Sequence, residues 1–348
     1  MAVVPAVPKE EWAALHEAAA EFKALEAWNW MKDGDLFAVL NPEKNEIGYC
    51  CVLGMRGEVF ALVVYLGSEG LAVHKRMRGG LDAFADDTEL THIYKCLMAS
   101  FEDWKALEKE DKAVIKSLGL KFKGHAAWPM FRSYQPCCAP WFLGSAEARF
   151  LVVVLRQAVI VAQRFKENPK LLVPPKEGQV FLRFPAMKDS GVEWQDRWLE
   201  PEPWEEPKQM PSPINELKMA LIKKEIPEQT GIWELALSTM PMALTDRERP
   251  YYPRFLLCAE QQSGLLLCGD VLDPWKYSAQ LPDMLINAMD KSKLMPKEIW
   301  VQQAELVELL RPVLSRLNIP IAQKSSLRMI ERVKDSLGPY LDGMTIGR

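Results

Sequence analysis

The stretch LFAVLNPEKNEIGYCCVLGMRGEVFALVVYL, residues 36–66, decides the fold of the first half of the chain. It contains three runs rich in β-branched, aromatic and other apolar residues, at 36–40, 47–53 and 59–66. The spacers NPEKN and GMRG between them consist of residues that favour turns. Strands joined by such short turns pair with their neighbours along the chain, so this stretch predicts an antiparallel meander.

Helical patterns surround the meander. Apolar residues recur at helical spacing after Pro8, where acidic residues occupy the first turn. The expected helices occupy residues 9–28, 67–77, 103–118 and 145–165, and a further strand is expected at 178–184. Strands and helices that share a core predict an α+β domain, an antiparallel meander with helices, over residues 1–199.

The segment WPMFRSYQPCCAPWF, residues 128–142, holds three prolines and five aromatic residues. Proline fixes φ and removes a backbone donor, so we expect a shaped loop here. Arg132 and Tyr134 place polar groups near the rings of Trp128 and Trp141. These four are the predicted ligand-binding residues, acting by stacking and cation–π contacts. The alternative is that the prolines and rings cover a hydrophobic core.

The sequence EPEPWEEPKQMPSP, residues 200–213, carries five prolines and four acidic residues. Such composition favours an extended, semi-rigid connector. We therefore expect a linker here and a second domain over residues 214–348, because a chain of 348 residues exceeds one ordinary core.

The second domain shows three strand-like runs followed by alternating helices and strands. The expected strands lie at 232–240, 254–259, 265–272, 298–301 and 319–322. Helical patterns follow the third, fourth and fifth of these runs, and another lies near 214–224. This order predicts a mixed sheet flanked by helices.

The order resembles the ribonuclease H-like fold used by retroviral-type integrases and DDE transposases. The first strand begins with Trp233, the second and third are joined through Ser263 and Gly264, and the fourth follows a proline in PKEIWVQQAEL. The resemblance implies an α/β domain with a mixed five-stranded sheet in the order 3-2-1-4-5.

In that superfamily, aspartates on the first and fourth strands hold two metal ions about 4 Å apart for phosphoryl transfer. Here Ala236 and Gln302 stand near these positions, and neither supplies charge to a hard cation. We therefore expect a vestigial domain without catalytic residues, metal or cofactor. The alternative is a metal-dependent nucleic-acid enzyme, similar to a nuclease or transposase, that uses the displaced acids Glu234, Asp270 and Glu331.

The full chain is also similar to an uncharacterised bacterial family with two paired domains of unknown function. The resemblance is carried by residues 36–71, by LGLKFKG and WPMFRSYQPCCAPW, and by YYPRFLLCAEQQSGLLLCGDVL at 251–272. It brings no activity with it.

Charge, hydropathy and cysteine content indicate which partners and which cellular location to expect. The formal net charge of −4 and a pI near 5.8 make nucleic acid an unlikely general partner. The chain has no apolar run of membrane-spanning length and begins without a basic leader, so neither a membrane span nor a secretory signal is expected. Seven cysteines, including the vicinal pairs 50–51 and 137–138, indicate a cytoplasmic protein with reduced thiols.

Other catalytic chemistry has weaker support. The four histidines are scattered and no Cys-x-x-Cys occurs, so a zinc site is not expected. A nucleophilic Cys137 or Cys138 needs a histidine nearby, for which His125 is the candidate, but buried, inert thiols are the favoured interpretation. The favoured function is a non-catalytic binding or scaffold protein, with a protein or a small molecule as its partner.

Overall fold

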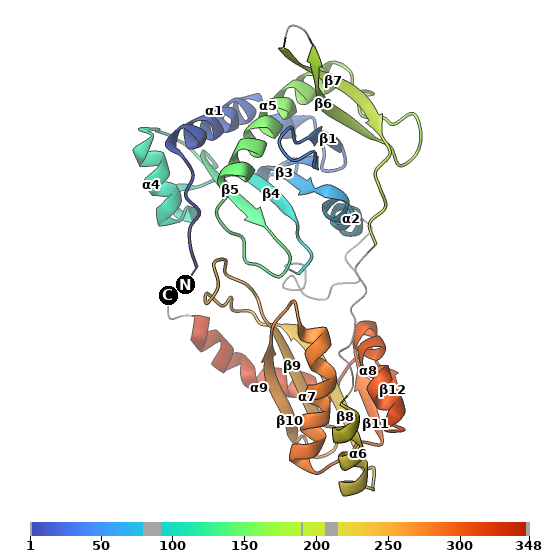
Figure 1. The fold of residues 1–348 in the computed structure, drawn as a ribbon. Helices are drawn as coiled ribbons and strands as arrows, with labels where there is room; N and C mark the ends of the chain where they lie inside the picture. The colour runs from blue at the N-terminus through green and yellow to red at the C-terminus, as the bar shows by residue number, and fades with distance from the viewer. Residues whose placement is uncertain (1, 79–91, 189–190, 206–214, 346–348) are drawn as a thin grey trace. The chain divides into compact units, whose positions relative to one another are not determined.

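The computed structural model describes residues 2–78, 92–188, 191–205 and 215–345, with the backbone alone for 188 and 337–345 (Figure 1). The described residues form two compact units, one up to residue 205 and one from residue 215. The expected linker at 200–213 lies largely outside the described residues.

The first unit combines a large sheet with helices on both faces (Figure 1). Its helices are α1 (Lys9–Leu25), α2 (Gly67–Arg78), α4 (Lys109–Ser117) and α5 (Ser145–Glu167), with short 3-10 helices η1 (Ala27–Asn29) and η3 (Trp104–Ala106). Its strands are β1 (Phe37–Leu40), β2 (Ile47–Leu53), β3 (Phe60–Leu66), β4 (Cys96–Glu102), β5 (Trp128–Tyr134), β6 (Val180–Lys188) and β7 (Gly191–Leu199).

The described strands of this unit form one seven-stranded sheet in the order β5-β4-β3-β2-β1-β6-β7. The predicted meander of β1, β2 and β3 is confirmed by their antiparallel pairing. The sheet as a whole is mixed rather than antiparallel, because β6 pairs with β1 in parallel. β7, which the sequence did not predict, then pairs antiparallel with β6.

Each face of the sheet has its own apolar cluster. On one face, α1 and α5 bury side chains such as Phe22 and Leu151 against Phe37, Leu62 and Phe131. On the other face, Leu71 of α2 packs in a cluster with Tyr49 and Tyr65. Successive strand residues point to opposite faces, so the unbroken apolar runs of β2 and β3 suit a sheet covered on both sides.

The segment at 128–142, expected to be a loop, begins with a regular strand. Residues 128–134 form β5, and only the residues after Tyr134 form irregular structure before α5. Pro129 is tolerated because β5 is the last strand of the described sheet, and its outer side is bridged to Trp141 at Ser133 rather than at Pro129. The helix expected at 103–118 is also shorter, since α4 begins at Lys109 after η3.

The second unit contains a five-stranded sheet between two layers of helices (Figure 1). Its helices are α6 (Glu216–Glu225), α7 (Tyr277–Ser292), α8 (Ala304–Arg316) and α9 (Arg328–Thr345). Its strands are β8 (Ile232–Thr239), β9 (Arg254–Glu260), β10 (Leu266–Leu272), β11 (Glu298–Val301) and β12 (Ile321–Gln323).

The strands of this sheet lie in the order β10-β9-β8-β11-β12, which is 3-2-1-4-5 when counted along the unit. β9 is antiparallel to both neighbours, whereas β8, β11 and β12 are mutually parallel. Trp233 and Ile299 face the cluster formed with α6, α7 and α8, and Ala236 and Ala259 face the cluster formed with α9.

Candidate functional site: an apolar pocket under the N-terminal segment

A pocket of about 320 Å³ lies where four parts of the first unit meet. Residues 4–7, here named the strap, form one wall, and the start of α1, the middle of α4 and β5 form the others. Its lining is mainly apolar and includes the rings of Trp12, Phe131 and Phe142. We call it the strap pocket.

His16 supplies the pocket with a buried polar group. Its side chain belongs to α1, is only 4% exposed, and has an Nδ1 without a hydrogen-bond partner among the described residues. The ring packs edge-on against Phe131, with centroids 5.1 Å apart, and stacks on Phe122 at 6.3 Å. Burial lowers the pKa of His16 to about 4, against a smaller opposing effect of Asp111. The imidazole is therefore neutral at pH 7 and can donate or accept one hydrogen bond at Nδ1.

Arg132 joins α4 to β5 beside the pocket. Its guanidinium donates to both carboxylate oxygens of Asp111, at 2.9 and 2.7 Å, and to Glu108 at 3.2 Å. It also lies 4.6 Å from the ring centroid of Phe142. Burial acts to lower the pKa of Arg132, but the hydrogen bonds and charges of Asp111 and Glu108 outweigh it and raise the pKa.

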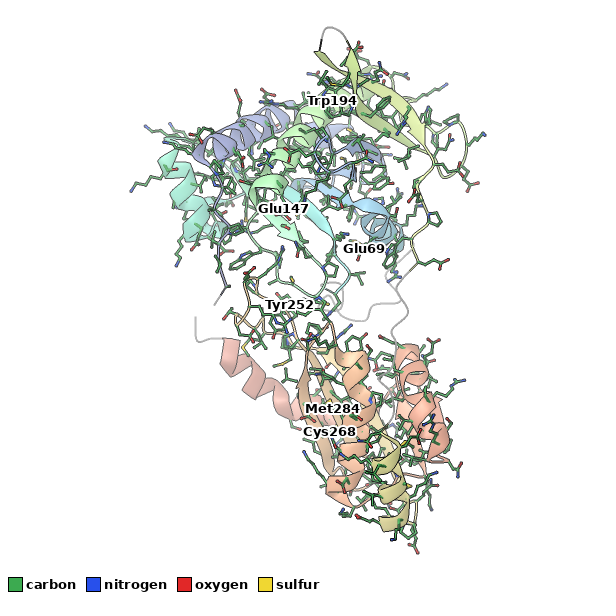
Figure 2. All side chains as sticks on the ribbon, in the orientation of Figure 1. Glu69, Glu147, Trp194, Tyr252, Cys268 and Met284 are labelled. Carbon is green, nitrogen blue, oxygen red and sulfur yellow. The ribbon has the colours of Figure 1, made fainter. Side chains whose placement is uncertain are left out.

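Two further contacts fix the wall of the pocket. The indole Nε1 of Trp141 donates to the carbonyl of Val3 at 3.0 Å and so attaches the residue just before the strap to the loop after β5. Glu147 of α5 (Figure 2) binds both β5 and the end of that loop, since it accepts from Ser133 Oγ at 2.7 Å and from the backbone N–H of Gly144 at 2.8 Å.

The four predicted ligand-binding residues take separate places around this region. Trp128 lines a groove on the outer side of α4, Arg132 makes the ion pairs described above, and Trp141 binds the carbonyl of Val3 just before the strap. The hydroxyl of Tyr134 lies 3.6 Å from Met98 Sδ, and its ring packs against Tyr94. Their role as ligand contacts remains a prediction.

His16 is a candidate residue that the sequence pattern did not single out. Its neighbours Leu15, Ala18 and Ala19 on α1 are fully buried, so a histidine among them was the available signal. Nothing in the sequence indicated that the strap forms part of a pocket. Its apolar residues come near α4 and β5 only once the chain has folded.

No disulfide joins the cysteines of the described residues, and six of the seven are buried. His92, rather than His125, is the imidazole beside Cys137: its Nδ1 lies 3.1 Å from the Cys137 Sγ. His125 contacts the carboxylate of Asp103 instead, also at 3.1 Å. Cys137 therefore lies in the loop after β5, beside a different histidine from the expected one.

The acidic residues considered for metal binding in the second unit do not converge. Glu234 is 1% exposed, and its Oε2 accepts from the backbone N–H groups of Met329 and Ile330, at the start of α9. Asp270 is the cross-strand partner of Leu256, so its side chain lies on the face of the sheet opposite to that of Glu234. Glu331 is exposed on α9. Among the described residues, no three His, Cys, Asp or Glu side chains are grouped for a metal ion.

Comparison with known families covers both units. Residues 12–183 match the domain of unknown function DUF7309, and residues 218–338 match the domain of unknown function DUF6930. The two matches lie in tandem along the chain. The DUF7309 match begins at Trp12 and so includes every wall of the strap pocket except the strap itself.

The remaining comparisons add no activity to either domain. The DUF6930 match includes the whole five-stranded sheet and most of α9. A search of curated proteins finds no match to the chain. In the described part of both domains, none of the helices combines the length and apolar character that a membrane crossing requires.

Proposed function

We propose that the protein is a non-catalytic binding protein whose DUF7309 domain takes a small aromatic molecule with one polar group in the strap pocket. The observation that carries this proposal is a pocket with aromatic walls whose lining includes His16, a residue with a buried Nδ1 that has no hydrogen-bond partner among the described residues. A buried polar atom without a partner costs about 1 to 3 kcal/mol, which a ligand hydroxyl or amide at this position offsets.

The size and chemistry of the pocket define the ligand class. An apolar cavity of about 150 Å³ accommodates benzene, so about 320 Å³ suits a molecule of one or two rings. The rings of Trp12, Phe131 and Phe142 favour stacking or edge-on contacts. A neutral His16 gives no charge for an anion to pair with, so an uncharged ligand is favoured.

Phenol and toluene are suitable probes, because they share a ring and differ in one hydroxyl. We expect titrations followed by ligand-observed NMR to give tighter binding of phenol by about 2- to 10-fold, as one hydrogen bond predicts. His16→Phe keeps a ring but removes the polar atom, so the preference should disappear. A phenol preference that survives in His16→Phe contradicts the proposal.

A filling variant tests the location. Val114 lines the pocket from α4, and Val114→Phe should weaken both probes. Val173→Phe, at a residue that is 61% exposed, is the matched control and should leave both unchanged. Unaltered binding in Val114→Phe places the probes elsewhere and contradicts the proposal.

For the DUF6930 domain we propose a ribonuclease H-like topology without two-metal chemistry. The order 3-2-1-4-5, with only the second strand antiparallel to its neighbours, supports this topology. The engagement of Glu234 with the α9 backbone supports the loss of chemistry, since two close cations need several converging acids.

A magnesium titration by calorimetry tests this second proposal. We expect no binding heat at millimolar Mg²⁺, as for a site without an acidic cage. The alternative, a metal-dependent nucleic-acid enzyme, instead predicts a binding heat and a nuclease activity that Glu331→Gln removes. Either result contradicts the vestigial interpretation.

A further inference from the structure

A groove of about 550 Å³ runs along the outer side of α4 in the DUF7309 domain. Three rings line it, those of Trp104, Phe122 and Trp128. Five lysines also line it, namely Lys109, Lys112, Lys116, Lys121 and Lys123, and the described lining includes no acidic residue. We call it the lysine groove. Ala113 lines both it and the strap pocket, so the two lie on either side of α4.

The acidic residues nearest in sequence already have partners, and one of these partners is a groove lysine, because Glu110 lies 3.6 Å from Lys109 Nζ. Glu108 and Asp111 bind Arg132 on the pocket side of α4. Asp103 accepts from the backbone N–H of Ala126 and contacts His125. None of these acids compensates the positive charge of the other four lysines, Lys112, Lys116, Lys121 and Lys123, although the chain carries a net charge of −4. A local field of this kind attracts anions whatever the overall charge.

The lysines form a row rather than a point. Lys109, Lys112 and Lys116 are spaced i, i+3 and i+7, so they share one face of α4 and extend over about 10 Å. Lys121 and Lys123 continue the row after the helix ends. A single phosphate cannot meet charges spread over this length, whereas a chain of phosphates can.

The rings beside this row are exposed, as in Trp104, or half-buried, as in Phe122 and Trp128. Trp104 is 44% exposed, and its ring packs against Trp128 with centroids 6.1 Å apart at 57°. The Nζ of Lys112 lies 5.3 Å from the Trp104 ring centroid. The exposed Trp104 and the half-buried Trp128, set beside lysines, combine a stacking surface with phosphate-binding cations, which is how proteins hold unpaired bases.

From these features we infer that the lysine groove binds single-stranded nucleic acid. Bases stack on Trp104 and Trp128, and the phosphates follow the lysine row. A duplex hides the faces of its bases and offers the rings nothing to stack on. An acidic peptide would satisfy the lysines but would leave the tryptophans without a specific partner. This site is separate from the strap pocket and does not depend on its ligand.

Fluorescence anisotropy with a labelled oligothymidylate of about ten nucleotides tests the inference. We expect Trp104→Ala and Trp128→Ala each to weaken binding by about 5- to 150-fold, as the loss of one stacked base predicts. Lys112→Gln and Lys116→Gln should each reduce the slope of log affinity against log salt by about 0.7.

Matched controls come from the DUF6930 domain. Trp275→Ala removes a ring that is 45% exposed, and Lys223→Gln with Lys224→Gln removes exposed cations of α6. Neither change should alter the affinity. Circular dichroism and cooperative unfolding of each groove variant establish that the DUF7309 domain remains folded, independently of any ligand of the strap pocket.

Three results would overturn the inference: equal affinity for a duplex of the same length, equal affinity for an oligoglutamate, or tryptophan variants that bind as the wild type does. The first two indicate a surface that attracts any polyanion. The third indicates that bases do not stack in the groove. Phenol binding in the strap pocket can persist in every one of these cases.

Discussion

Arg132 has one role in the sequence-based prediction, ligand binding, and another in the structure, a buried ion pair. Among aromatic residues and prolines, an arginine suggests a cation–π contact with a ligand. In the fold its side chain is 6% exposed and makes two hydrogen bonds to Asp111, which itself lies on α4. A planar guanidinium suits such a two-point bond, and lysine cannot reproduce it.

The variant Arg132→Met should therefore act mainly on stability. Removing one partner of a buried pair leaves Asp111 without its counter-charge, and we expect a loss of about 3 to 5 kcal/mol in the free energy of unfolding by urea. Arg149→Met is a matched control, because Arg149 also binds two carboxylates but on the surface, and its effect should be much smaller. Unchanged stability in Arg132→Met contradicts the structural role.

His16 should make the DUF7309 domain sensitive to acid. The folded domain takes up a proton at His16 only near pH 4, whereas the unfolded chain does so near pH 6.5. Between these values the unfolded state binds more protons, so stability falls as the pH is lowered. The full effect is on the order of 3 kcal/mol.

Urea unfolding at several pH values between 4 and 6.5 measures this effect. Carboxylates also titrate in this range. The informative quantity is therefore the difference in the free energy of unfolding between the wild type and His16→Phe at each pH. That difference should shift in favour of the variant as the pH falls. A constant difference contradicts the burial of a neutral imidazole.

At the level of elements, apolar patterning predicted more than composition did. The meander followed from apolar runs separated by turn residues, and those local signals placed β1, β2 and β3 within a residue or two. The prolines of 128–142 led to the prediction of a loop where the chain forms β5. Pro129 is tolerated because β5 is an edge strand, and the place of a strand in its sheet cannot be read from local composition. β7 gave little pattern since most of its residues are exposed or half-buried.

The contact between Glu234 and α9 leads to a prediction for that helix. Glu234 reaches from the middle of β8 to two backbone N–H groups at the helix start, where a negative charge also favours the helix dipole. Glu234→Gln keeps an acceptor but loses the charge, and we expect a cost of about 1 kcal/mol.

Glu331→Gln is the matched control, because Glu331 lies in the first turn of the same helix but is exposed. Its effect on unfolding by urea without metal should be clearly smaller. Hydrogen exchange in α9 should rise only in Glu234→Gln. If Glu234 instead served a metal site, its substitution would abolish magnesium binding and leave the stability of the metal-free protein unchanged.

For the whole molecule, the sequence predicted two domains from one composition shift and two separate hydrophobic patterns. The sites were not predictable in the same way. The strap pocket combines residues 4–7, 12–16, 110–114 and 129–142, and the lysine groove brings Trp128 to α4. The lysine spacing on α4 is visible in the sequence, but the ring beside it depends on the position of β5. Contacts between distant segments arise only in the folded chain.

The separate cores lead to the last prediction, which concerns independent folding. Every described apolar cluster draws its residues from one unit alone, so neither core needs the other. Limited proteolysis should therefore cut first within 200–213, where the proline-rich, acidic composition favours an extended chain. The two fragments should each unfold cooperatively on heating, and the first should still bind phenol. Initial cleavage within β3 or β10, or a fragment that unfolds without cooperativity, would show that the units stabilise each other.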